Sequence, residues 1–266
     1  MPFGRSGSLF FHSLMDGHPE ISTLPGAYFK GFFGQNVWKI LNSNAKSSGY
    51  KGLVDEFCEH YQVLFDARAN RRVFGDPFGQ FCTPGQGSGL KEMGENRDQW
   101  LSLNKDKFKA NLIALLKEQV DLDNKVFFQL IHRAYDQTLG RKGNKKVLFY
   151  HIHNPTFYEA THFLKLFPQA KFMLIVREPV QALESWVRMF FLECMETPDA
   201  VPRQNRSDNN KVLGGYRGMA DRVWDVFDKF PSPLFELRTT KAIRLEDIKR
   251  SPRDAMPAIA RWMGVK

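Results

Sequence analysis

The sequence has few cysteines and lacks any long apolar run. Its three cysteines, Cys58, Cys82 and Cys194, are far apart and form neither a CxxC pair nor another spacing typical of metal ligands. An odd number of separated cysteines argues against a disulfide framework and favours reduced thiols in a cytoplasmic compartment. No stretch reaches the roughly 20 apolar residues of a membrane-spanning helix, and the N-terminus does not resemble a signal peptide. We therefore expect a cytoplasmic protein without a membrane span.

Internal repeats and low-complexity tracts are also absent, and the composition is typical of a globular protein. The 266 residues are 42% hydrophobic and 25% charged, and 24 phenylalanines contribute to an aromatic share of 14%. This content excludes disorder of the whole chain and suffices for one large domain. The net charge of +9 favours an anionic ligand. No basic run or nucleic-acid-binding motif accompanies that charge, so we expect no nucleic-acid partner.

Short apolar segments alternate with helical ones, most clearly in the second half of the chain. Residues 145–151 and 171–177 have the pattern of strands buried on both faces of a parallel sheet, and residues 155–167 have the length of a crossover helix. Further helices are predicted at 8–17, 53–69, 105–118, 123–139, 179–193, 213–229 and 252–263, and a further strand near 234–245. Dense Gly and Pro predict an irregular insertion near 70–100.

This alternation predicts an α/β fold. We expect a single domain with a central, mostly parallel β-sheet flanked by helices. In such a sheet the ligand crevice lies at the carboxyl ends of the strands. Candidate functional residues are therefore sought where apolar strand segments end.

The first candidate is the segment GRSG, followed by the apolar run SLFF. Small residues at Ser6, Gly7 and Ser8 let the backbone approach an anion and turn several N–H groups toward one point. If Ser8 or a neighbour opens a helix, the positive end of the helix dipole adds to that field. Arg5 supplies a planar, permanently charged donor for phosphate or sulfate. The alternative is a flexible Gly/Ser segment with an isolated arginine.

The position of this segment in the chain is unusual for a phosphate loop. Such a loop ordinarily follows a buried strand, but only Met1, Pro2 and Phe3 precede Gly4. We therefore expect the first strand to be largely missing from this chain.

The second candidate is Arg177, which ends the apolar run FMLIV. A cation at the end of a buried strand needs an anionic partner, either a carboxylate or a ligand phosphate. Glu178 is a poor choice for that partner, because it is adjacent and faces the other way. Ser185 lies eight residues after Arg177, in a predicted helix that can return it toward the same edge. The alternative is an arginine paired with a distant carboxylate and a serine without a role.

The third candidate is HIHNP, residues 151–155, at the end of a predicted strand. His151 and His153 are two residues apart and would share one face of that strand. Histidine is suited to general base catalysis near neutral pH. A metal pair and two structural histidines are the alternatives. The metal alternative lacks an identifiable set of further ligands, although His162 and several carboxylates exist.

Together these segments resemble the sulfotransferases that use 3′-phosphoadenosine 5′-phosphosulfate (PAPS). GRSGSLFFHSLMDGHPEI (residues 4–21) is similar to the family's 5′-phosphosulfate loop, in which Lys or Arg precedes Ser-Gly-Thr-Thr. KFMLIVREPVQALESWV (171–187) is similar to its 3′-phosphate motif, in which Ser follows Arg by eight positions. RLEDIKRSPRDAMPAIARWMGV (244–265) is similar to the segment RYEDL…P…FLG, and HIHNP is similar to Lys-Thr-His of the cytosolic branch.

The resemblance implies a sulfotransferase domain over residues 1–266, truncated at both ends, that transfers a sulfuryl group from PAPS to a hydroxyl or amine acceptor. It implies that PAPS is held by six residues, which are Arg5, Ser6, Gly7, Ser8, Arg177 and Ser185. It makes His153 the expected general base and His151 the second choice, with Arg5 also acting in catalysis. No metal is implied, and the acceptor is not identified.

Departures from the family's pattern keep alternatives open. Arg5 replaces the Lys of the cytosolic branch, and 22–29, where other branches place a glutamate base, contains no carboxylate. The Arg-Lys-Gly…Gly-Asp-Trp loop of the cytosolic branch is absent after Lys266. A metal-dependent hydrolase using His151 and His153 is one alternative. A P-loop kinase is another, although the chain lacks its longer glycine spacing followed by Lys-Ser/Thr.

Overall fold

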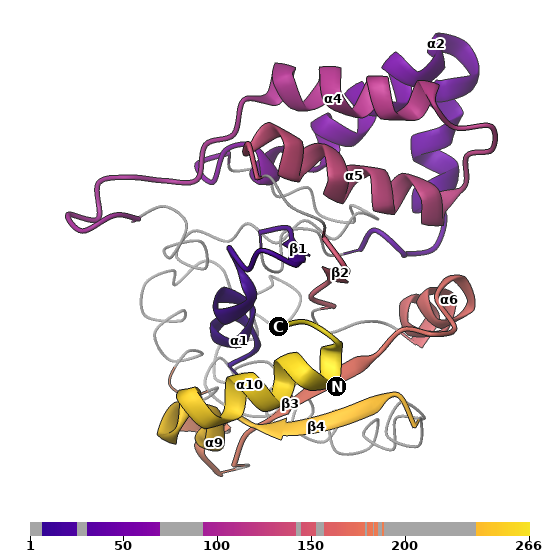
Figure 1. The fold of residues 1–266 in the computed structure, drawn as a ribbon. Helices are drawn as coiled ribbons and strands as arrows, with labels where there is room; N and C mark the ends of the chain where they lie inside the picture. The colour runs from indigo at the N-terminus through magenta and orange to yellow at the C-terminus, as the bar shows by residue number, and fades with distance from the viewer. Residues whose placement is uncertain are drawn as a thin grey trace, which may run out of the picture. The chain divides into compact units, whose positions relative to one another are not determined.

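The computed structural model describes residues 7–25, 31–69, 93–141, 145–152, 157–178, 180–182, 184, 185, 188 and 238–266 (Figure 1). The chain divides into two compact units. The β1–β2 unit comprises Leu9–Ala170 and Ala260–Lys266, and the β3–β4 unit comprises Met1–Ser8 and Lys171–Ile259. Each unit contains a two-stranded parallel sheet, so the described fold is mixed α/β. A single central sheet stays a prediction.

The sheet of the β1–β2 unit is short. β1 (Ile21–Thr23) pairs in parallel with β2 (Val147–Phe149), with Ile21 opposite Val147. All three residues of β1 are buried. The Lys145 ammonium donates to the carbonyls of His18, at 2.8 Å, and Ile21, at 3.0 Å, and so ties the start of β2 to the entry of β1.

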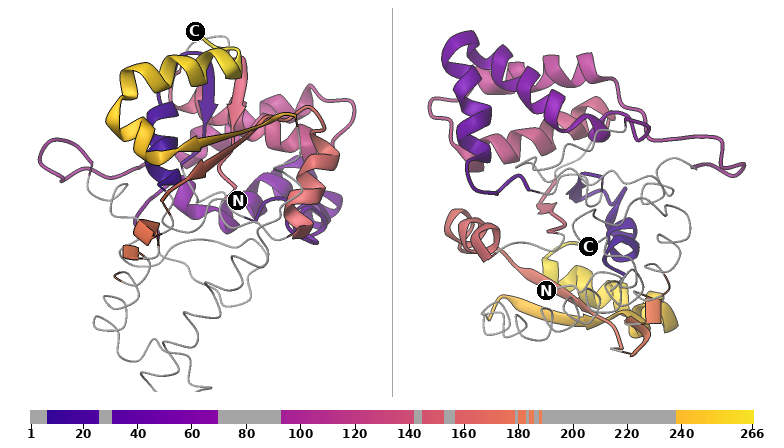
Figure 2. Two further views of the ribbon diagram at one scale, coloured as in Figure 1. Left: turned by 90° about the horizontal axis from the view of Figure 1, so that it is seen from below. Right: turned by 180° about the vertical axis from the view of Figure 1, so that it is seen from behind.

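Helices make up most of the described residues of the β1–β2 unit. These helices include α1 (Ser8–Met15, whose first residue belongs to the other unit), α2 (Val37–His60), the short 3₁₀ helix η2 (Gln62–Leu64), α4 (Lys105–Lys117), α5 (Asn124–Thr138) and α6 (Phe157–Leu166). α4 lies alongside α5, and α2 packs on α4 (Figures 1 and 2). The side chains of Asn104 and Asp123 cap α4 and α5, because each accepts a hydrogen bond from the backbone N–H three residues later.

Aromatic side chains fill the core of this unit. Phe33 is 2% exposed, and its ring lies 5.0–6.3 Å from six others, those of Phe32, Phe128, Tyr150, His162, Phe163 and Phe167. Edge-to-face pairs of this kind contribute beyond the area that they bury. The abundance of phenylalanine noted in the sequence therefore serves core packing.

A buried polar cluster joins β1 to α5. The Ser22 hydroxyl donates to the Asp136 carboxylate, and its oxygen lies 3.2 Å from Nδ1 of His132. This arrangement leaves the Ser22 oxygen to accept from the Nδ1–H of a neutral His132. Burial, and to a lesser extent the nearby His12, lowers the pKa of His132 to about 3. The cluster therefore holds an uncharged imidazole in the core.

A second part of the cluster ties β1 to the end of α1. Asp16 accepts from the Thr23 hydroxyl at 2.6 Å and from the Arg141 guanidinium at 2.9 Å. Arg141 also lies 3.7 Å from the Asp136 carboxylate. Asp16 thus joins β1 to Arg141, whose guanidinium also lies near the α5 carboxylate of Asp136.

The β3–β4 unit is built around a longer parallel pair. β3 (Phe172–Val176) pairs with β4 (Thr240–Arg244), with Val176 opposite Arg244, and the two strands lie side by side (Figures 1 and 2). α9 (Leu245–Arg250) follows β4 directly. α10 (Pro252–Met263) comes next and crosses from this unit into the other at Ala260.

Most predicted elements that fall on described residues are confirmed. The structure has helices near 8–17, 105–118, 123–139, 155–167 and 252–263, and strands within 145–151, 171–177 and 234–245. The predicted helix at 53–69 is wrong in its bounds, because α2 runs from Val37 to His60 through a kink at Gly49. The predicted helix at 213–229 and most of the predicted insertion lie outside the described residues. In the described ranges we find no helix with the length and hydropathy of a membrane span.

The neutral histidine in the polar cluster predicts a specific acid sensitivity. The pKa of His132 is lowered in the folded state, so folding opposes its protonation, and stability is lost as the pH falls below the ordinary value of 6.5. One such group makes the free energy of unfolding at pH 5 about 2 kcal/mol lower than at pH 7. Urea unfolding followed by circular dichroism should show a flatter pH dependence in His132→Asn than in the wild type. Equal slopes in the two proteins would contradict a buried neutral imidazole.

Candidate functional site

The carboxyl end of β3 brings two distant segments of the chain together. Arg177 directly follows β3, at the strand end where the sequence places it. The backbone N–H of Glu178 donates to Oε1 of Glu246, at 3.2 Å. Because Val176 pairs with Arg244, the residues that follow both strands emerge at the same edge. The candidate arginine and the start of α9 thus belong to one local arrangement.

Glu178 begins the helical segment that carries Ser185. Its carboxylate accepts from the Gln181 N–H at 2.8 Å, and its carbonyl accepts from the Ala182 N–H at 3.0 Å. These contacts are those of a helix N-cap. The described residues between 180 and 188 are helical, and Ser185 among them is half-buried. Arg177 and Ser185 therefore lie on either side of one capping residue.

Gly7 belongs to the same unit and packs on the first residue of α9. Its φ of +83° is in the left-handed region, which favours glycine. A Cβ at this position would lie 2.5 Å from Cδ2 and 2.7 Å from Cδ1 of Leu245, whose side chain is buried. Ser8, the next residue, opens α1, as the sequence predicts. The backbone at Gly7 is thus held close to the strand–helix junction after β4.

Charges of both signs gather at this edge. Although desolvation acts to raise it, the backbone N–H groups of Glu246 itself and Glu178 hold the pKa of the Glu246 carboxyl below its usual value. The charges of Arg244 and Arg177 act in the same direction. Nε of Arg244 lies 4.0 Å from Oε2 of Glu246. Among the described residues, Glu246 is thus a carboxylate whose pKa responds to the charge of Arg177, and the sequence alone did not identify it, while the Glu178 carboxylate caps the helix.

The candidate histidines belong to the β1–β2 unit. β2 ends at Phe149, so His151 follows the strand rather than lying within it, and it is 7% exposed. Its ring centroid is 6.0 Å from that of His12, a buried histidine whose pKa is lowered by desolvation. Arg5, Ser6 and His153 lie outside the described residues. Their roles stay predictions.

Neither a catalytic triad nor a metal site is formed by the other polar residues described below. Ser22, His132 and Asp136 have the residue types of a nucleophilic triad, but Ser22 donates directly to Asp136 and all three side chains are buried. This arrangement differs from a triad, in which the imidazole takes the serine proton. Among the described residues no group of three His, Cys, Asp or Glu side chains could hold a metal ion.

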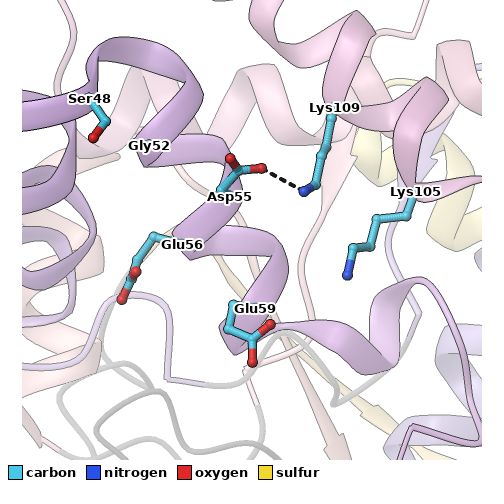
Figure 3. A pocket seen from close by; sticks show the side chains of 7 residues that line it. All are labelled: Ser48, Gly52, Asp55, Glu56, Glu59, Lys105 and Lys109. Atoms are coloured by element: carbon cyan, nitrogen blue, oxygen red, sulfur yellow. Dashed lines mark hydrogen bonds and ion pairs between the residues drawn. The ribbon is translucent and has the colours of Figure 1, made fainter.

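A charged pocket of about 520 Å³ lies between α2 and α4 (Figure 3). Asp55 of α2 faces Lys109 of α4 across it. Asp55 pairs with Lys109 at 2.5 Å and with Lys51 at 2.6 Å, and Glu56 lies 2.8 Å from Nε2 of His60. Because Asp55, Glu56 and Lys109 already have partners, these three side chains offer no unpaired charge to a ligand.

The close packing of Gly7 predicts a sensitive position. Gly7→Ala should lower the free energy of unfolding by about 1–3 kcal/mol, because the methyl group meets Leu245 and the alanine disfavours the positive φ. Urea unfolding followed by circular dichroism would measure this loss. Gly17→Ala is the matched control, since Gly17 also has positive φ and has nothing within 4 Å of its Cβ position. Similar losses in both variants would show that the packing on Leu245 is unimportant.

Comparisons with known proteins do not assign this chain to a family. Neither the family models, nor the curated proteins, nor the solved structures include a match to this chain. The proposal that follows therefore depends on the residues and on their arrangement.

Proposed function

We propose that this chain is a PAPS-dependent sulfotransferase, which transfers the sulfuryl group of PAPS to a hydroxyl or amine acceptor and releases 3′,5′-ADP. One observation carries the proposal. Three segments that resemble the family's motifs, represented by Gly7, Arg177 and Leu245–Glu246, meet in a single unit. They are far apart in the sequence, and their meeting is what a shared nucleotide site requires.

Residues at the 5′ end of the nucleotide would stabilise the negative charge that develops during transfer. PAPS, when bound, supplies an activated sulfuryl group whose leaving group is a nucleotide phosphate. Arg5 and the backbone N–H groups of Ser6, Gly7 and Ser8 would stabilise the negative charge that grows on the bridging oxygen. A left-handed glycine directly before a helix suits this role, because it turns N–H groups toward a common point.

The other end of the nucleotide would be held near the end of β3. Arg177 offers a charge-assisted contact to the 3′-phosphate, and Ser185 offers a hydroxyl. His153 would accept the proton of the acceptor hydroxyl. His151, two residues earlier in the chain, is the second choice for this role. The buried surroundings of His151 favour a supporting role for that histidine, since it is only 7% exposed.

The 3′-phosphate contact predicts a selective loss of affinity. Arg177→Ala should weaken 3′,5′-ADP binding by about 10- to 150-fold, the range expected for a hydrogen bond to a charged group. Binding of 5′-AMP should stay nearly unchanged, because that nucleotide has no 3′-phosphate to lose. Titration calorimetry with both nucleotides measures the difference. Ser185→Ala should show the same selectivity with a smaller effect.

The matched control for this measurement is Arg253→Ala, which removes an exposed arginine of α10 in the same unit. It should bind both nucleotides as the wild type does. Parallel weakening of both nucleotides in Arg177→Ala would mean that Arg177 supports the fold or the 5′ end, and the 3′-phosphate assignment would be wrong.

The two histidines should differ in their effect on turnover. His153→Ala should lower kcat by roughly 100-fold or more, the loss expected when a general base is removed. His151→Ala should lower it less. Sulfate transfer from PAPS to a panel of phenol, sugar and amine acceptors provides the assay. The reverse ranking would move the base to His151, and equal losses accompanied by loss of a bound metal would favour a metal-dependent hydrolase.

A further inference from the structure

The first two residues of α9 each contact a different part of the candidate site. The Leu245 side chain packs against the backbone of Gly7, and the Glu246 carboxylate accepts the N–H of Glu178. One dipeptide after β4 therefore contacts the segment proposed for the 5′-phosphosulfate and the turn proposed for the 3′-phosphate. None of the candidate residues from the sequence lies in this dipeptide.

Glu178 is constrained by hydrogen bonds on all of its polar groups. Its N–H donates to Glu246, its carbonyl accepts from Ala182, and its carboxylate accepts from Gln181. The last two contacts belong to the helix, whereas the first joins this turn to another segment of the chain. That contact constrains the peptide between Arg177 and Glu178.

The charge of Glu246 adds to this geometric constraint. Its carboxylate lies 4.0 Å from Nε of Arg244, and only 20% of its side chain is exposed. Desolvation acts to raise the pKa of this carboxyl, but the backbone N–H groups and then the charges of Arg244 and Arg177 lower it. Two arginines near one strand edge repel each other, and an ionised carboxylate near them offsets that repulsion. Glu246 can thus offset part of the positive charge at this edge before an anion binds.

We propose that Glu246 is a positioning residue, which fixes the turn after β3 and holds Arg177 and the Ser185 helix in the geometry that receives a 3′-phosphate. This inference rests on the proposed function, because it takes the 3′-phosphate as the anion at this edge. Glu246 acts through Glu178 and Arg177 and does not itself contact the nucleotide.

Two variants of Glu246 separate its hydrogen bond from its charge. Glu246→Ala removes both, whereas Glu246→Gln keeps an oxygen that can accept the Glu178 N–H. Asp247→Asn is the matched control, because Asp247 is the next residue of α9 and is exposed. Hydrogen exchange at the Glu178 amide is measured by NMR without ligand, and affinity for 3′,5′-ADP and 5′-AMP is measured by calorimetry.

The proposal expects Glu246→Ala to speed exchange at the Glu178 amide and to weaken 3′,5′-ADP binding by roughly 10-fold, with 5′-AMP affinity unchanged. Glu246→Gln should retain most of the amide protection and show a smaller loss, and Asp247→Asn should match the wild type. A merely structural role would lower the affinity for both nucleotides together. That result, or unchanged affinity for both in a folded Glu246→Ala protein, would overturn the proposal.

Failure of the positioning role of Glu246 and failure of the proposed function give different results in these measurements. If Glu246→Ala does not fold, Glu246→Gln decides by the same selectivity between nucleotides. If the wild type shows no preference for 3′,5′-ADP over 5′-AMP, the proposed function fails. Exchange at the Glu178 amide then still tests the anchoring role, which unchanged protection in Glu246→Ala would contradict.

Discussion

The parallel pairing of β3 with β4 is the constraint on which the candidate site depends. Parallel strands present their carboxyl ends at the same edge, so whatever follows each strand must share that edge. Here the register sets Val176 opposite Arg244, and the hydrogen bond from Glu178 to Glu246 closes the gap between segments 68 residues apart. Leu245 lies between Arg244 and Glu246 in the chain, and its side chain packs against the backbone of Gly7. A shift of the β3–β4 register would separate Gly7, Glu178 and the Leu245–Glu246 dipeptide.

The β1–β2 unit is stabilised by a different combination of forces. Its core consists of aromatic rings packed around Phe33, while its short sheet is anchored by buried polar groups such as Ser22 and His132. A three-residue strand offers few ladder hydrogen bonds, so side-chain contacts must supply the missing anchoring. The cost is a buried imidazole that must stay neutral, which links the stability of this unit to pH.

Much of the secondary structure could be predicted from the sequence, but the contacts at the site could not. α4 and α5 have regular apolar spacing and capping side chains at Asn104 and Asp123, so their limits were predicted to within two residues. α2 was mispredicted because residues 42–48 are mostly polar and small, and Gly49 interrupts the helix with a φ of +62°. A regular spacing of apolar residues identifies a helix with one apolar face. α2 has no such face over much of its length.

The place of Arg177 could be predicted because a charged residue after a buried apolar run marks a strand end. Its carboxylate neighbour, Glu246, could not be, since only the register of β3 on β4 brings the two together. The segment RLED contains Glu246, but the local sequence does not encode which strand pairs with which. Gly7 was identified as a loop glycine, whereas its contact with Leu245 required the tertiary structure.

We propose that a nucleotide with phosphates at both its 3′ and 5′ positions is the ligand of the β3–β4 unit. A thermal-shift comparison of 3′,5′-ADP, ATP and 5′-AMP on the whole chain tests it most directly. A ligand at 100 times its Kd stabilises the folded state by about 2.7 kcal/mol, which is readily seen as a rise in Tm. If the proposed ligand is right, 3′,5′-ADP produces the largest rise in Tm. An equal or larger rise with ATP, or no rise with any of the three, would contradict it.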